Sequence, residues 1–305
     1  MNDQLIGKGN LNSAWKPSNK SLKLEGNFYR ESEPIILFNG FYYPYEEDES
    51  LALNLKLNQA ELSMFKMYTK SFLTDINGKA NANINLTGNL KKPALSGNLT
   101  LANTDFTVTY LNTKYRTDLC SVNISPDMIS CDNVAFFDVN NNKANVNGTV
   151  YHTWFTDWSV GVGIEANNFL ALNTSEKDNK LYYGVGYVSG LVDINSYMEQ
   201  LTIDVKVKTE KNTVLNIPLT DNEDLVENDF IEFISNDSLN IKKEEEVDLS
   251  NIEMNFDLEI TPDAETRLIF DDQIGDVMKS TGNGNIKMQI SKDGDLSMFG
   301  NYVVK

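Results

Sequence analysis

The chain has 305 residues, of which 41% are hydrophobic, and its formal net charge is −18. The apolar fraction is sufficient for a packed core and excludes a disordered chain as the default interpretation. The acidity, without a run of Lys or Arg, argues against a nucleic-acid-binding protein, and the lack of an 18-residue apolar run argues against a transmembrane helix.

The two ends of the sequence predict a fragment of a longer protein. Met1-Asn2-Asp3 opens directly into polar sequence instead of a signal peptide, and the chain ends at Lys305 within a strand pattern. We therefore expect residues 1–50 to supply N-terminal strands of a longer β structure, and residues 51–305 to form a C-terminal β domain.

Apolar and polar residues alternate with a period of two over most of the chain. Successive side chains of a strand point to opposite faces, so Ala80, Ala82, Ile84 and Leu86 are expected to share one face. The alternation recurs, between turn sequences, in residues 51–57, 76–111, 144–155, 158–166, 201–208, 252–260 and 286–298. This pattern predicts an all-β fold whose apolar face is buried by curling of the sheet into a sandwich, a barrel or an open trough.

Two short helices are expected among the strands. Apolar residues have helix-like spacing in residues 59–74 and 222–235, and acidic residues near the start of the second segment suit the helix dipole. Residues 237–248 are polar and charged, which predicts an acidic, mobile loop. We interpret the other acidic runs, such as Glu46 to Glu49, as solvated loops.

The residues needed for catalysis are scarce. His152 is the chain's single histidine and lies in a strand pattern, so we interpret it as structural rather than catalytic. The cluster of Asp271, Asp272 and Asp276 is expected to lie in an acidic loop. A phosphate-binding Gly loop is absent from the sequence. We therefore expect a protein that is not an enzyme and binds no cofactor.

Metal binding is not expected either. Zinc sites need several His or Cys ligands, which this composition does not offer. The segment that begins at Asp138 resembles the start of a calcium loop, but Lys143 and Thr149 stand where such a loop requires Gly and Glu. We interpret Asp138 to Asn142 as a hairpin turn.

The two cysteines flank a turn that is predicted at Ser125-Pro126-Asp127. If the flanking strands form a hairpin, Cys120 and Cys131 lie near each other across it. A disulfide in an oxidising compartment and a pair of buried thiols are both consistent with this spacing.

One phrase of the sequence resembles a repeated motif of a known family. Residues 88–101 read GNLKKPALSGNLTL, which is similar to the phrase G-x-L-x-x-P-x-x-x-G-x-L-x-L of the AsmA-like proteins. More narrowly, the phrase resembles the C-terminal region of the TamB family, a subunit of the translocation and assembly module. Further pieces resemble that region in the same order between Leu51 and Tyr302, among them residues 137–148, 168–174, 216–219, 229–233 and 256–264. The Asn-rich style is similar to Bacteroidetes members.

The resemblance implies a fold and a role. Members of the family form an elongated, curled β sheet, a half-pipe or "taco" with an apolar concave face. They are anchored in the inner membrane of Gram-negative bacteria and cross the periplasm toward an outer-membrane barrel of the TamA or BamA type. They are linked to phospholipid transport between the membranes, and to assembly of outer-membrane proteins and secretion of autotransporters. Phospholipid acyl chains, that barrel and the inner membrane, through an anchor outside this sequence, are therefore the expected partners.

The apolar side chains of the alternating strands are the candidates for a lipid groove, because a dry lining is what acyl chains need. These candidates are Ile84, Leu86, Leu99, Leu101, Phe106, Val108, Val160, Val162, Ile164, Ile203, Val205, Phe256, Leu258, Ile286 and Met288.

Two alternatives stay open on the sequence alone. The apolar face can be a closed β core, as in a structural or adhesin-type repeat domain. It can also belong to a chaperone that templates strands of outer-membrane proteins through its sheet edges without conducting lipid.

Overall fold

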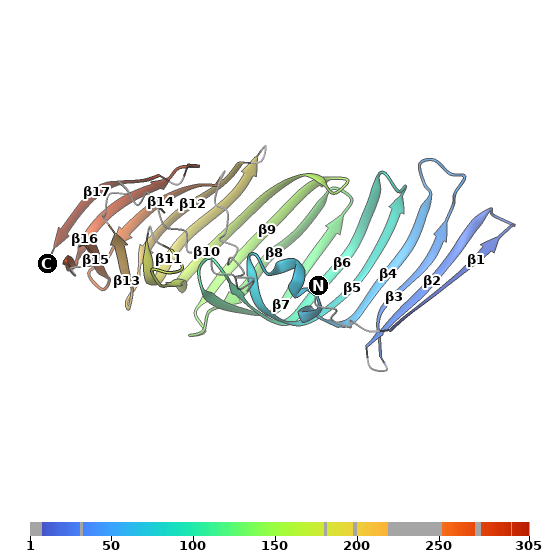
Figure 1. Cartoon of the computed structure of the whole chain (residues 1–305), viewed down its shortest axis with the longest axis horizontal. Helices are drawn as coiled ribbons and strands as arrows, with labels where there is room; N and C mark the ends of the chain where they lie inside the picture. The colour runs from blue at the N-terminus through green and yellow to red at the C-terminus, as the bar shows by residue number, and fades with distance from the viewer. Residues whose placement is uncertain are drawn as a thin grey trace, which may run out of the picture.

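The computed structural model describes residues 8–30, 33–179, 182–197, 200–218, 252–271, 276–293 and 295–304. In this part of the chain the fold is all-β, as the sequence predicts, and the strands form one sheet with strands following one another along the long axis (Figure 1). The strands are β1 (Lys8–Lys16), β2 (Ser21–Arg30), β3 (Glu33–Tyr42), β4 (Leu51–Glu61), β5 (Leu73–Gly88), β6 (Pro93–Val108), β7 (Thr113–Ser125), β8 (Met128–Phe137), β9 (Lys143–Thr153), β10 (Thr156–Thr174), β11 (Tyr183–Tyr197), β12 (Gln200–Thr209), β13 (Val214–Pro218), β14 (Ile252–Ile260), β15 (Glu265–Asp271), β16 (Asp276–Ile290) and β17 (Leu296–Val304).

The pairing is antiparallel between consecutive strands from β1 to β12. Beyond β12 it becomes mixed: β12 pairs in parallel with β14, and β13 with β15. Both β14 and β15 then pair antiparallel with β16, which also pairs with β17. Together with the β11–β13 pairing, these contacts close a ring of six strands, and the other strands lie outside it.

At two positions in this ring, a pair of shorter strands lies end to end in place of one long strand. Along β11, residues 184–195 pair with β10 on one edge, so β12 and β13 must share the other edge, where they lie end to end. Their parallel partners β14 and β15 likewise follow each other along β16. The sequence pattern did not reveal this ring, because alternation within a strand carries no information about which strand pairs with which.

β-Bulges bend the strands along a line that crosses the sheet. Gln59, Asn103, Asn133 and Asn168 each have a positive φ of 47–49° and each sits where the pairing register shifts. In three of the four, a side chain of the next strand accepts the freed backbone N–H: Asn81 Oδ1 at 2.9 Å, Asn147 Oδ1 at 2.8 Å and Ser189 Oγ at 2.9 Å. Bulges of this kind increase the local bend and twist of a strand, so this line of bulges curves the sheet.

The expected helix over residues 59–74 is much shorter in the structure. Residues up to Glu61 remain in β4, and only η1 (Leu62–Phe65) and α1 (Lys66–Thr69) are helical before β5 begins at Leu73. The apolar spacing that predicts the longer helix instead arises from strand ends on both sides of a short helical connection. The expected helix at 222–235 and the acidic loop at 237–248 lie outside the described residues.

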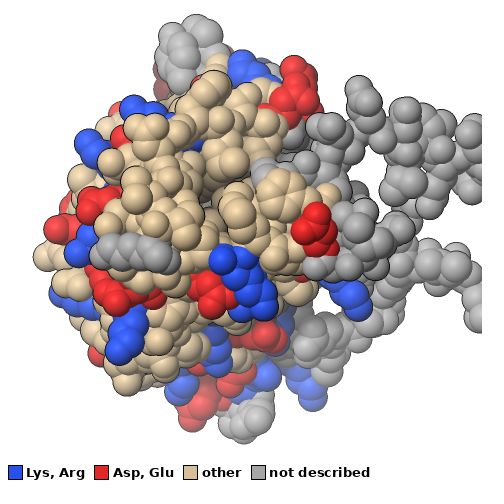
Figure 2. Space-filling model, turned by 90° about the vertical axis from the view of Figure 1, so that its left-hand side faces the viewer, with Lys and Arg blue, Asp and Glu red and all other residues tan. Residues whose placement is uncertain are grey.

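In the described part of the chain, both ends of the sheet are open strand edges. All nine residues of β1 are exposed, and β17 exposes Met298, Phe299, Val303 and Val304. Seen from the C-terminal end, uncharged residues cover the upper middle of the surface, while Lys, Arg, Asp and Glu gather mostly along the left and lower outline (Figure 2). Open edges of this kind can accept a further strand.

Strands β5 and β6 approach each other closely at Gly97. Its φ is +147°, and a Cβ atom there would lie 2.1 Å from the backbone oxygen of Asn83 on β5. We expect Gly97→Ala to lower the free energy of unfolding by about 2 kcal/mol or more, because neither backbone can move aside without breaking the β5–β6 pairing. Chemical denaturation measures this effect.

Gly161→Ala in β10 is the matched control, since its Cβ would meet only the Asn195 side chain at 3.7 Å. Equal losses in the two variants would contradict the steric explanation.

Candidate functional site: the apolar face of the sheet

An unbroken row of small and apolar residues crosses the sheet on one face. Each member is the registered partner of the next, so all of them point to the same side. From β1 to β17 the row is Gly9, Phe28, Ile36, Leu57, Ala82, Leu99, Val122, Cys131, Gly148, Val162, Ile194, Ile203, Met254, Ile290 and Leu296. We call this side the apolar face.

A second row runs parallel to the first from β1 to β10. Its members are Leu11, Gly26, Phe38, Leu55, Ile84, Gly97, Ile124, Ile129, Val150 and Val160. Sequence reasoning missed the contributions of β2, β3, β7 and β8 to these rows, although the alternation of Leu22, Leu24 and Phe28 already signalled one of them.

Most of the groove candidates from the sequence lie in packed clusters. Leu99 and Leu101 pack against a cluster around Ala60 and Ala80. Nine more candidates belong to the clusters formed by β6–β11 and by the strands around the ring: Phe106, Val108, Ile164, Ile203, Val205, Phe256, Leu258, Ile286 and Met288. These parts of the apolar face are filled by the protein's own side chains.

Four candidates lie outside these clusters. Ile84, Leu86, Val160 and Val162 are half-buried and belong to none of the four packed clusters of the described residues. They lie farther from the bulges along β5 and β10 than the packed residues Ala80, Ile164 and Ala166. The structure therefore divides the candidates into a packed group and an open strip.

The turn between β6 and β7 reaches across to the C-terminal strands. Tyr110 and Leu111 pack on a cluster that contains Tyr182 and Met254, and the Leu111 carbonyl accepts a 2.9 Å hydrogen bond from the backbone N–H of Asn173. The hydroxyls of Tyr110 and Tyr182 are 3.2 Å apart. Since β7 and β14 are far apart in the order of strands, these contacts require strong curvature of the sheet.

The region where β7 meets β10 is tightly packed. The Tyr115 ring stacks on Phe169 with 4.8 Å between centroids, and its hydroxyl donates a 3.0 Å hydrogen bond to the Leu170 carbonyl. Burial raises the pKa of Tyr115 to about 12, so the hydroxyl keeps its proton and acts as a donor.

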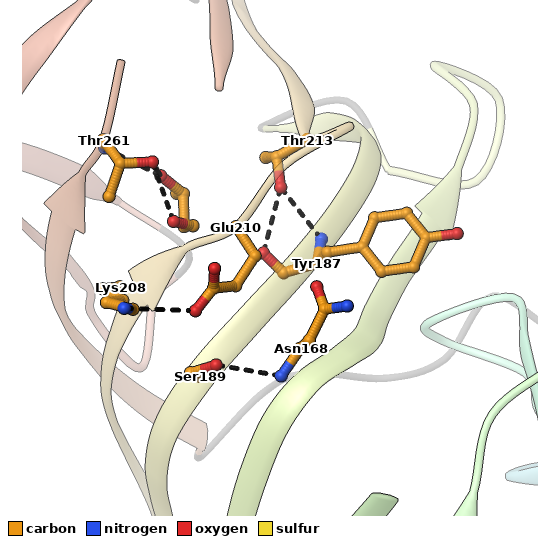
Figure 3. A network of polar contacts seen from close by, with 8 residues as sticks. Asn168, Tyr187, Ser189, Lys208, Glu210, Thr213 and Thr261 are labelled. Atoms are coloured by element: carbon orange, nitrogen blue, oxygen red, sulfur yellow. Dashed lines mark hydrogen bonds and ion pairs between the residues drawn. The ribbon is translucent and has the colours of Figure 1, made fainter. Parts of the chain in front are cut away.

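Polar side chains satisfy the backbone where the ring strands are interrupted (Figure 3). Thr213 Oγ1 accepts from the Tyr187 N–H and donates to the Tyr187 carbonyl, both at 3.0 Å. Thr261 donates its N–H to Thr209 Oγ1 and its hydroxyl to the Thr209 carbonyl, both at 2.9 Å. A shallow polar depression lies beside this network, lined by residues that include Asn142, Glu165, Asn168, Ser189, Lys208 and Glu210. These contacts replace missing ladder hydrogen bonds, so the network is structural.

The hairpin turn that the sequence predicts at Asp138 is present. The Asp138 carboxylate is buried and accepts hydrogen bonds from the backbone N–H groups of Asn140, Asn142 and Leu170, at 2.8–2.9 Å, and from the Asn142 amide. Its oxygens thus hold the β8–β9 turn against β10.

His152 packs in an aromatic group. Its ring stacks on Phe155 with 4.4 Å between centroids, and Nδ1 accepts a 3.2 Å hydrogen bond from the Phe155 N–H. Its Nε2 is buried without a hydrogen-bond partner. These contacts agree with the structural interpretation of this histidine.

Cys120 and Cys131 are free thiols on the apolar face, on the neighbouring strands β7 and β8. A hydrogen bond from Cys120 lowers the pKa of Cys131 to about 7, whereas the same contact and burial raise the pKa of Cys120. Disulfide formation between them stays a prediction.

Two general findings hold for the described residues. None of their helices is long and apolar enough to span a membrane, and their His, Cys, Asp and Glu side chains include no group of three that could hold a metal ion. The side chain of Asp271 and all of Asp272 lie outside the described part of the chain.

Comparison with known proteins gives one match. The family model described as the TamB C-terminal domain matches residues 40–124 and 134–305. Searches of curated proteins and of solved structures return no match.

The division of the apolar face can be tested by truncating one residue in each group. Met288 is buried in a packed cluster, so Met288→Ala should lower the free energy of unfolding by about 2–5 kcal/mol. Ile84→Ala should cost less than half as much, because its side chain already contacts solvent. Urea denaturation of the two variants makes the comparison, and equal losses would show that the strip at Ile84 is packed as well.

The thiols should differ in reactivity. At pH 7 we expect iodoacetamide to modify Cys131 before Cys120, because the lowered pKa gives Cys131 a larger thiolate fraction and Cys120 is buried. Peptide mass spectrometry over time measures the order. In Cys120→Ala the pKa of Cys131 should rise, and its modification at pH 7 should slow; an unchanged rate would contradict the hydrogen bond as the cause.

Proposed function

The chain belongs to the family of the TamB C-terminal domain, and we propose that its apolar face holds phospholipid acyl chains on a route between the inner and outer membranes. Membership ties the chain to the translocation and assembly module, and to a family of bacterial envelope components that span the periplasm. The family is not known as enzymatic. We propose a periplasmic location for this chain, within a protein anchored in the inner membrane.

The unbroken apolar row is the observation that carries this proposal. It crosses the sheet from β1 to β17. None of the packed clusters of the described residues covers the strip formed by Ile84, Leu86, Val160 and Val162. Transfer of an acyl chain from water to such a strip is favourable by about 0.8 kcal/mol per CH₂ group. The lining offers few fixed polar contacts, so a chain can slide along it.

The sheet serves in this proposal as a half-pipe along its N-terminal strands. The packed clusters around the ring and next to the bulges leave less room for a ligand, so we assign the lipid-holding section to the part of the apolar face of β1–β10 that lies farther from the bulges than those clusters. The barrel of the TamA or BamA type is the proposed partner in the outer membrane.

The open edges favour a second candidate function. β1 is exposed over its whole length and β17 over most of it, and among the described residues each pairs with a strand on one edge alone. A strand of a nascent outer-membrane protein or autotransporter could pair with either edge by β-augmentation. This role in assembly is compatible with lipid holding, because it uses the ends of the sheet rather than its apolar face.

The proposed function is tested by placing a charge on the open strip. We expect Ile84→Asp and Val162→Asp to fold and to lose phospholipid that copurifies with the parent protein, because the half-buried site can hydrate a carboxylate but an acyl chain cannot lie against it. Native mass spectrometry with lipid extraction measures bound phospholipid after expression with access to membranes. Thr87→Asp is the control, since Thr87 is exposed on the opposite face of β5.

Three results would count against the proposal. A parent protein without phospholipid would favour the closed-core or strand-templating alternative. Undiminished lipid in folded Ile84→Asp and Val162→Asp would remove the strip as the binding surface. Unfolding of both variants would identify a packed core at this strip.

A further inference from the structure

The strands of the sheet end along two long edges, where the turns lie, and these two edges are built differently. Alternate turns of an antiparallel sheet lie on opposite edges. The turns β1–β2, β3–β4, β5–β6, β7–β8 and β9–β10 therefore share one edge, which we call the lip edge; the first three run along the upper right of Figure 1. The opposite edge carries η1, α1 and the turns β6–β7 and β8–β9.

The edge opposite the lip edge is covered. Leu62 and Phe65 of η1 pack with Leu99 and Leu101 of the apolar face. Farther along the chain, Tyr110 and Leu111 pack against the C-terminal part of the same face. A ligand approaching from this side would have to displace packed side chains.

The lip edge carries the tryptophans of the chain at its surface. The chain has three tryptophans, and all three lie on this edge: Trp15 near the end of β1, Trp154 in the β9–β10 turn and Trp158 at the start of β10. They are 47%, 47% and 49% exposed. Tyr45, in the β3–β4 turn, is 73% exposed.

Contacts link the turns of the lip edge, and one of them reaches past the β7–β8 turn. Trp15 meets Tyr45 edge-to-face with 6.4 Å between ring centroids. Asn89 in the β5–β6 turn donates a 2.8 Å hydrogen bond to the carbonyl of Glu47 in the β3–β4 turn. Lys92 in the same β5–β6 turn places its Nζ 4.6 Å from the centre of the Trp154 ring.

The indole rings border the apolar face. Trp15 is registered with Leu22, and Leu22 with Tyr42, so all three share the side that carries the apolar rows. The ring centroids of Trp158 and His152 are 5.0 Å apart. His152 follows Val150 of the second apolar row by two residues along β9. Apolar surface, indole rings and lysine thus follow one another from the sheet interior outward.

We propose that the lip edge admits a single zwitterionic phospholipid sideways onto the apolar face. The acyl chains lie on the open strip, the glycerol and ester groups lie at the level of the indoles, and the headgroup stays in water. Indole rings favour this boundary because they combine an apolar body with a polar N–H group. This proposal rests on the proposed function and adds the side of access and the class of headgroup.

The charges of the lip edge match a headgroup of both signs. Lys91 and Lys92 can pair with a phosphate, and the acidic run Glu46 to Glu49 is held beside them by the Asn89–Glu47 hydrogen bond. An ammonium group such as that of phosphatidylethanolamine complements this run, whereas the glycerol of phosphatidylglycerol adds no positive charge.

Tryptophan fluorescence tests the proposal directly, because the three tryptophans all report on the lip edge. The protein is loaded with phosphatidylethanolamine brominated either near the acyl carbonyl or near the terminal methyl, and bound lipid is counted by native mass spectrometry. We expect greater loss of emission with bromine near the carbonyl. We also expect more phosphatidylethanolamine than phosphatidylglycerol to be bound from an equimolar mixture.

Val139→Trp in the background Trp15→Phe, Trp154→Phe, Trp158→Phe is the matched control, compared with the parent at an equal number of bound lipids counted by native mass spectrometry. Val139 is 59% exposed in the β8–β9 turn, on the opposite edge, so its emission should not change with bromination. Far-UV circular dichroism checks that the variant folds. A second control retains Trp158 alone and should show the quenching of the parent.

The outcomes separate this proposal from the proposed function. Bound lipid with no quenching at the lip edge, with equal quenching at position 139, or with stronger quenching by terminal bromine would overturn sideways access at this edge and leave lipid holding intact. Equal binding of the two lipids would overturn the headgroup class. A parent that binds no phospholipid would overturn both proposals.

Discussion

The fold depends on keeping one face of the sheet apolar although its strands bend at the bulges. A strand alternates strictly, so a single extra residue would turn every following side chain to the wrong face. The bulges insert such residues together with a shift in register. In β6, odd-numbered Leu99 and Leu101 precede Asn103, even-numbered Phe106 and Val108 follow it, and both pairs belong to packed clusters of the apolar face. The curvature of the sheet and the continuity of its apolar face therefore share one cause.

This bending produces two regions with different properties. At and beyond the bulges, the curved strands bring residues such as Phe106 and Phe169 together in a packed cluster. Farther from the bulges, toward the other ends of the strands, Ile84 and Val162 keep contact with solvent. The same chain can thus hold a stable core and an accessible apolar surface, because the core supplies the free energy of folding that the open strip does not.

The sequence predicts the all-β fold and the apolar face well, because both follow from local alternation. It also contains a signal for the bulges, since polar pairs such as Asp132-Asn133 and Asn167-Asn168 stand where the alternation changes parity. It could not show that Met288 is packed while Ile84 is open, because both have the same alternating pattern and differ only in long-range curvature. The predicted helix at 59–74 was overextended for a related reason: a short helical connection between apolar strand ends imitates helical spacing.

The orientation of the strands also determines how the molecule bears a mechanical load. The strands follow one another along the long axis and run across it (Figure 1), so the backbone hydrogen bonds between them point along that axis. Tension applied between β1 and β17 would load each ladder in an unzipping direction, in which bonds break one after another rather than together. A sheet built this way yields by peeling at its weakest pair of strands.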